Sequence, residues 1–204
     1  MTQKQRKSTL FLAATLLVTG AIFSYFAVTH FDLLEARPTL GGEVKLKDRS
    51  LAGSRLVLNG SSTHSRFIFE VYNLSLYLTQ ETKEASEIIE QVFTKDKFLI
   101  VEMRFLMDLT PKEFRQAWEE SFVENCESYC EKAKEDFHTL LAQTRGFKRG
   151  DQLIIEIFSD HLLIRFSDQT YKSENKAFAK ALLLTWIGKN PPSRGFKQSL
   201  LGNG

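Results

Sequence analysis

The fold is decided by residues 58–78, which read Leu-Asn-Gly-Ser-Ser-Thr-His-Ser-Arg-Phe-Ile-Phe-Glu-Val-Tyr-Asn-Leu-Ser-Leu-Tyr-Leu. From Phe67 to Val71 large apolar residues alternate with their neighbours, the period of a half-buried strand. The apolar set then continues one residue out of phase from Leu74 to Leu78. A single strand cannot do this without turning its face over, so we predict a β-bulge or kink at Tyr72–Asn73, a feature often found beside binding sites.

The composition indicates one globular domain with an aromatic core. The chain has 204 residues, of which 43% are hydrophobic and 17 are phenylalanine, enough for one sizeable core. Lys4, Arg6 and Lys7 precede the apolar N-terminal segment, and removing these three from 27 basic residues leaves 24 against 25 acidic ones. The folded part is therefore about neutral, and we expect no nucleic-acid partner, which would need a concentrated basic patch.

A predicted membrane anchor follows the basic tail of residues 1–7. Residues 8–30 are 23 residues without Asp, Glu, Lys or Arg, and a helix needs about 20 to cross a bilayer. The basic tail before it and acidic residues after it predict an inside N-terminus and an outward-facing domain, joined through a linker at 31–41. The alternative is a cleaved signal peptide, whose basic and apolar regions have the same order.

The rest of the chain alternates between strand and helix patterns. We expect strands at 43–47, 55–59, 97–105, 151–158, 162–166 and from 171, and helices at 84–93, after Thr110, over 127–143, from Asn175 and at 194–201. Thr110, Pro111 and Glu113 form a capping box with proline in the first turn. Helices grouped between two sets of strands predict an α+β domain, an antiparallel sheet covered on one face by helices.

The two cysteines, Cys126 and Cys130, lie four residues apart within a helical pattern. We interpret them as two small buried apolar residues, or as a disulfide across one turn in an oxidising compartment. The spacing fits neither a redox Cys-x-x-Cys site nor haem attachment, and we predict no metal site.

Four segments, in this order and spacing, resemble the chalcone isomerase fold, and most closely its bacterial chalcone isomerase-like branch. They are Leu58-Asn-Gly with the strand ending Leu76-Tyr77-Leu78, Leu109-Thr-Pro-Lys-Glu-Phe-Arg, Lys148-Arg-Gly-Asp, and Leu183-Leu-Thr-Trp-Ile-Gly. The resemblance covers residues 42–202 and implies an open-faced β-sandwich in which a large antiparallel sheet and helices enclose a hydrophobic cleft. It also implies that the anchor lies in a bacterial inner membrane, single-pass, with the domain in the periplasm, or that the domain is released there or secreted after cleavage.

The resemblance also locates candidate site residues. By position, the arginine that the family's enzymes carry in the cleft falls at His64, their tyrosine at Phe114, their strand threonine at Tyr72 and their late threonine at Thr185, so only the last is kept. Ring closure on an enone places negative charge on a carbonyl oxygen and needs a cation or aligned donors there. With Phe114 lacking a hydroxyl, the chain is predicted to be a non-catalytic member of the family.

The leading hypothesis is a membrane-anchored binding protein for a small hydrophobic ligand, such as a fatty acid or another lipid. His64 or Arg66 would pair with a carboxylate. Tyr72, Phe114, Trp118, Leu182 and Thr185 complete the predicted site. Each of the helical residues among them is equally explained as core, as apolar stripes on amphipathic helices usually are.

Two other functions remain open from the sequence. An isomerase or intramolecular lyase acting on an enone-like substrate would need a cation and a hydroxyl that converge in a cavity. A scaffold that docks a partner at the membrane would have a filled interior. No cofactor is expected in the leading hypothesis. Its haem-binding variant would use His64, His138 or His161 as axial ligand.

Overall fold

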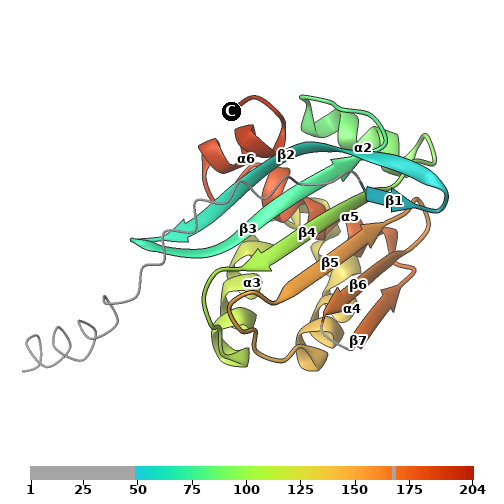
Figure 1. Cartoon of the computed structure of the whole chain (residues 1–204). Coiled ribbons are helices and arrows are strands. Elements are labelled where there is room, and N and C mark those ends of the chain that lie inside the picture. The colour runs from blue at the N-terminus through green and yellow to red at the C-terminus, as the bar shows by residue number, and fades with distance from the viewer. Residues whose placement is uncertain (1–48, 167–168) are drawn as a thin grey trace, which may run out of the picture. The chain divides into compact units, whose positions relative to one another are not determined.

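A seven-stranded antiparallel sheet forms the frame of the domain. The structure, a computed structural model, describes residues 49–166 and 169–204, which lie in one compact unit that spans Leu46–Gly204. Every strand pairs with its neighbours in sequence order, and the sheet curls like half a barrel (Figure 1). The strands are β1 Arg49–Leu51, β2 Ser54–Arg66, β3 Phe69–Leu78, β4 Leu99–Phe105, β5 Gln152–Ile157, β6 Leu162–Phe166 and β7 Gln169–Ser173.

Five α-helices of the described residues accompany the sheet. They are α2 Ala85–Phe93, α3 Pro111–Asn125, α4 Cys130–Gln143, α5 Lys176–Ile187 and α6 Arg194–Leu200. The capping box predicted at the start of α3 is present, because Thr110 and Glu113 satisfy each other's backbone N–H groups. Asn175 caps α5 by accepting from the N–H groups of Ala177 and Phe178. These local signals explain why the helices begin where the sequence predicted.

The main core lies between one face of the sheet and the helices. The alternate residues Leu74, Leu76 and Leu78 of β3 are buried there, beside Val101 and Met103 of β4. In Figure 1, α3, α4 and α5 lie behind the sheet. The α+β architecture with helices on one face is thus confirmed, and its core is as aromatic as the composition predicted.

Residues 58–78 form a hairpin, which corrects the expectation of a half-buried strand through Phe67–Val71. β2 and β3 pair along their length, and Phe67 and Ile68 form the two-residue turn between them. Phe67 and Phe69 are exposed at that turn rather than facing the helices. Apolar residues do alternate along this segment, but the turn contains no Gly, Asn or Pro. The sequence therefore carries no signal that distinguishes this turn from a strand.

The predicted irregularity near Tyr72 is present as a β-bulge one residue earlier. His64 pairs with Tyr72 while Ser65 pairs with Glu70, so Val71 is the extra residue of β3. Tyr72 lies two residues before Leu74 in unbroken register, so it shares that face and packs against the core. The bulge instead changes the phase of the residues before it, so Glu70 does not share the face of Tyr72.

The C-terminal helix α6 returns to β2, which lies far from it in sequence. The Nδ2 of Asn59 donates to the carbonyl of Leu200 at 2.8 Å, and the Oδ1 of Asn59 accepts from the N–H of Thr82 at 2.8 Å. A Cβ on Gly60 would lie only 2.0 Å from the carbonyl oxygen of Ser199. Glycine at this position therefore permits the close approach of α6 to the strand.

The helical pattern around the cysteines is broken rather than continuous. α3 ends at Asn125, residues Glu127–Tyr129 form a single 3₁₀ turn, and α4 begins at Cys130. Cys126 and Cys130 form a disulfide across this break. The bond thus links the ends of two helices instead of two positions within one helix.

Several predictions fall outside the described residues. These are the basic tail 1–7, the membrane anchor 8–30, the linker 31–41 and the strand expected at 43–47. Within the described part of the chain, none of the helices combines the length and apolar character that spanning a bilayer requires.

Candidate functional site

His64 and Tyr72 form one end of the candidate site. They are paired residues on β2 and β3, and their ring centroids lie 4.9 Å apart. Phe196 of α6 presents its ring edge-on to both, at 6.3 Å from His64 and 6.2 Å from Tyr72. Both side chains remain partly exposed, so this aromatic group lies between the sheet and α6 and can be reached from the surface.

Burial decides the protonation of these two side chains. Burial raises the pKa of the Tyr72 hydroxyl, an effect that a hydrogen bond from the Trp186 side chain opposes without cancelling it. The pKa of His64 is lowered, first by burial and then by the positive charge of Arg66. Near neutral pH the site therefore holds a protonated phenol and an uncharged imidazole, which are both hydrogen-bond donors and carry no net charge.

Trp118 and Trp186 connect this end to the helices. Trp186 lies on α5 next to Tyr72, and its ring is 6.3 Å from that of Trp118 on α3. The Trp118 ring is in turn 4.7 Å from Phe114, one turn earlier on the same helix. A continuous path of aromatic rings thus runs from β2 and β3 to α3. We call this set, His64, Tyr72, Phe114, Trp118, Trp186 and Phe196, the aromatic cluster.

Leu182 and Thr185 lie deeper, within α5. Both are buried in the interior, and the Thr185 hydroxyl donates to the carbonyl of Leu182 at 2.7 Å. A helical threonine that bonds back to its own helix has its proton already engaged. Thr185, the one residue kept from the enzymes that the chain resembles, is thus not a free donor in this structure.

Arg66 lies apart from the other predicted residues. It ends β2 beside the hairpin turn, pairs with Phe69 and is exposed. Its guanidinium acts on the site through its charge, which lowers the pKa of His64.

Among the predicted site residues, the structure brings His64 into contact with Tyr72, and Phe114 into contact with Trp118. Sequence reasoning left out the two residues that join them to their surroundings, Trp186 and Phe196. Trp186 adjoins Thr185 in sequence and could have been proposed from that position. Phe196 had no such signal, since only the return of α6 to β2 brings it near.

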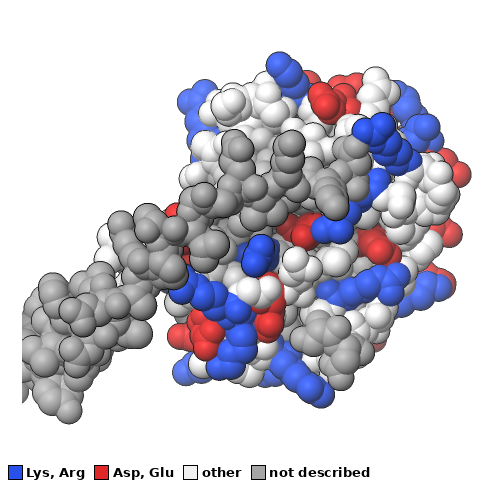
Figure 2. Space-filling model, viewed as in Figure 1, with Lys and Arg blue, Asp and Glu red and all other residues white. Residues whose placement is uncertain are grey.

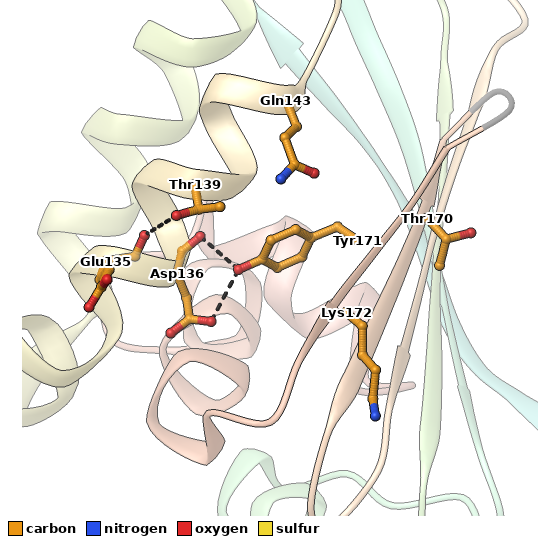
Figure 3. A pocket seen from close by; sticks show the side chains of 7 residues that line it. All are labelled: Glu135, Asp136, Thr139, Gln143, Thr170, Tyr171 and Lys172. Carbon is orange, nitrogen blue, oxygen red and sulfur yellow. Dashed lines mark hydrogen bonds between the residues drawn. The ribbon is translucent and has the colours of Figure 1, made fainter.

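A polar pocket of about 470 Å³ lies elsewhere, where α4 meets β7 (Figure 3). Burial alone would raise the pKa of Asp136, but hydrogen bonds from Ser173, Asn175 and Tyr171 outweigh it and lower this pKa. The carboxylate is therefore fully engaged in tying β7 and the start of α5 to α4. The pocket contains none of the predicted site residues.

The histidines proposed as haem ligands lie on separate elements. His64 belongs to β2, His138 is exposed on α4, and His161 lies in the turn between β5 and β6. His161 stacks on Phe158 with ring centroids 4.3 Å apart, and its Nδ1 is 2.6 Å from Asp160. Residues 49–166 and 169–204 contain no group of three or more His, Cys, Asp or Glu placed to hold a metal ion.

Charged side chains of both signs are interspersed over the face seen in Figure 2. Across the described residues, exposed charges of opposite sign also form local pairs, such as Lys148 with Asp108 at 2.9 Å and Lys172 with Glu174 at 2.8 Å. Exposed pairs of this kind contribute little to stability, and the face in Figure 2 shows no broad region of one sign.

Comparison with known proteins places this geometry in a family. A family model described as chalcone isomerase-like matches residues 41–202. Among solved structures, a fatty-acid binding protein of Arabidopsis thaliana is similar with a TM-score of 0.58 and 14% identity, over 72% of this chain and 87% of that one. At this identity the likeness shows the fold. No curated protein matches the chain.

Proposed function

The chain belongs to the chalcone isomerase-like family, and from this premise we propose that it is a non-catalytic binding protein for a small hydrophobic ligand such as a fatty acid. The aromatic cluster is the observation that carries this proposal. It offers a path of apolar rings that ends in two uncharged donors, Tyr72 and His64. Support also comes from the shared fold of a plant protein that is itself described as fatty-acid binding.

The polar end suits a carboxylate. The Tyr72 hydroxyl and an N–H of neutral His64 would donate to its oxygens, while Trp118 and Trp186 contact the apolar chain. The positive charge of Arg66 already disfavours protonation of His64. Because that field favours negative charge at the same place, it would also stabilise a bound anion.

The described side chains provide little of what enone cyclisation requires. Phe114 has no hydroxyl, Thr185 donates to its own helix, and Arg66 is exposed at the end of β2. Arg66 and a free helical hydroxyl therefore do not converge as the cation and donor that ring closure requires. This arrangement favours binding over the alternative isomerase or lyase activity.

We further propose that residues 8–30 anchor the protein in a bacterial inner membrane, with the domain in the periplasm. The apolar length and the flanking charges of this segment support the proposal. The disulfide Cys126–Cys130 supports an oxidising compartment. Release after signal-peptide cleavage is the alternative, and the N-terminus of the protein purified from bacterial membranes distinguishes the two.

Ligand binding is tested by titrating the full chain in detergent micelles with cis-parinaric acid, which accepts energy from tryptophan. We expect saturable quenching of Trp118 and Trp186 emission, and competition by oleic acid. Tyr72→Phe should weaken binding about tenfold, because a hydrogen bond to a charged group contributes about 1.5–3 kcal/mol. Tyr129→Phe, a partly buried tyrosine outside the cluster, is the matched control and should bind as wild type.

Three outcomes would contradict the proposal. Quenching that is linear in fatty acid and equal in every variant would show partition into micelles without a site. Conversion of a chalcone to a flavanone by wild type, and its loss in Tyr72→Phe, would show an enzyme instead. A Soret band on haemin titration that disappears in His64→Gln would favour the haem alternative.

A further inference from the structure

The β2–β3 hairpin ends in three consecutive exposed apolar side chains. Phe67, Ile68 and Phe69 are 92%, 78% and 55% exposed. Among the described residues, the only other exposed large apolar side chain is Val123, which has no exposed apolar neighbour in sequence. Isolated exposed apolar residues are normal, whereas a contiguous group marks an interaction site. We call residues Arg66–Phe69 the hairpin tip.

The turn itself is unfavourable for the residues that it carries. Phe67 has a φ of +57°, while Ile68 is not among the residues with positive φ. A two-residue hairpin turn with positive φ at its first position usually has glycine there. A bulky residue in this conformation is an outlier, and such strain concentrates at functional positions. Neither folding nor solubility therefore explains a phenylalanine at this position.

The hairpin tip projects beyond the rest of the sheet. β4 pairs with β3 only from Tyr72 onward, and the bond from the N–H of Leu106 to the carbonyl of Val71 is the next one outward. Figure 1 shows the hairpin extending past the ends of β4 and β5. The tip is thus a narrow protrusion of a few side chains, far smaller than the about 20–30 residues a side of a typical protein interface.

We propose that the hairpin tip inserts into the interfacial layer of a lipid bilayer. Phenylalanine and isoleucine at the turn would enter the acyl boundary, while Arg66 at its base would meet lipid phosphates. Glu70 lies one pair farther from the turn than Arg66 and Phe69, so it would stay at the aqueous side. This composition, apolar at the end and cationic at the base, suits a bilayer surface.

The proposal rests on the proposed membrane attachment, which keeps a bilayer within reach. The 18 residues 31–48 separate the predicted anchor from β1, and an extended chain of that length spans up to about 60 Å. Insertion would also give the proposed ligand a route, because the two strands that lead from the tip carry His64 and Tyr72. A fatty acid could then pass from the bilayer along the hairpin to the aromatic cluster.

The test uses the full chain in phosphatidylcholine liposomes, with Phe67→Trp as a reporter. We expect the added tryptophan to emit at shorter wavelength than the tryptophan of Val123→Trp in the same liposomes. Brominated phosphatidylcholine should quench about half of its emission, because interfacial side chains lie about 5–10 Å deep. Wild type supplies the background of Trp118 and Trp186. Val123→Trp is the matched control, at a position on α3 that is 73% exposed. The emission of its added tryptophan should not be quenched by the brominated lipid.

Flotation of the same samples separates this proposal from the attachment on which it rests. If the chain floats with the liposomes but Phe67→Trp is no more quenched than Val123→Trp, the hairpin tip does not insert, and the anchor stands. If the chain does not float, the attachment fails and this proposal fails with it. A blue shift without sensitivity to brominated lipid would indicate a protein contact and would also overturn it.

Discussion

Replacement of Gly60 by alanine tests the packing that places Phe196 in the aromatic cluster. The new Cβ would lie 2.0 Å from the carbonyl oxygen of Ser199 and 2.6 Å from that of Leu200. Both are backbone atoms, so they cannot yield by a change of rotamer, and α6 must move away from β2.

The expected cost follows from what that movement breaks. A small adjustment would cost the about 1–3 kcal/mol that is typical of overpacking. Separation of α6 would also expose Phe196 and Leu200, at about 1.5–3 kcal/mol each. It would in addition leave the Asn59 amide without its partner at Leu200, at about 1–3 kcal/mol. Since a gap of 2.0 Å is far below any real contact, we expect Gly60→Ala to lose about 3–5 kcal/mol of unfolding free energy.

Urea denaturation, followed by circular dichroism on the full chain in micelles, measures this loss as a lower midpoint. Gly195→Ala is the matched control, because a Cβ there meets nothing within 4 Å and alanine favours a helix. We expect the control to be as stable as wild type or slightly more stable. An unfolding free energy for Gly60→Ala within about 0.5 kcal/mol of wild type would refute the close approach of α6 to β2.

Three further changes probe other parts of the domain. Asn125→Ala should lose about 2–4 kcal/mol in the same urea assay, because the buried amide of Asn125 donates to the Asn190 carbonyl and accepts from the Asn190 N–H. Burial and then the charge of Arg66 lower the pKa of His64 in the folded state below its ordinary value, so unfolding free energy should fall as pH drops below about 6.5, and His64→Gln should remove that slope. Reduction of Cys126–Cys130 should cost at most about 2 kcal/mol, since the closed loop is short.

Each of these outcomes has a result that would count against it. Val123→Ala, at an exposed position on the helix that ends at Asn125, should change stability by less than about 0.5 kcal/mol. An equally small effect of Asn125→Ala would contradict a stabilising role for its hydrogen bonds to Asn190. A pH slope that persists in His64→Gln but disappears in His138→Gln would place the titrating group on α4. A loss on reduction that survives Cys126→Ser would show that the reductant acts elsewhere.

The sequence predicted most of the secondary structure because local signals suffice for it. The capping box at Thr110, the cap at Asn175 and the apolar period of α2 act within a few residues. The short connection between β5 and β6 likewise predicted their pairing. The sequence also named four of the six residues of the aromatic cluster: the family resemblance placed His64, Tyr72 and Phe114, and the apolar stripe of the helix that starts after Thr110 added Trp118.

The hairpin tip and Phe196 could not be predicted in the same way. An alternation through Phe67 and Phe69 is identical whether the strand continues into the core or turns back in solvent, because the pattern records which residues are apolar and not what covers them. Phe196 meets Tyr72 across more than a hundred residues of chain. No local period encodes that contact.

The α+β class and most of the elements in their order follow from the sequence alone, since caps, turns and apolar periods act over a few residues, but the turn between β2 and β3 does not. Which aromatic residues meet, and which remain in solvent, depends on how the elements pack together. The close approach of α6 to Gly60 brings Phe196 to His64 and Tyr72. Such contacts depend on how distant segments pack, and packing is a property of the whole core.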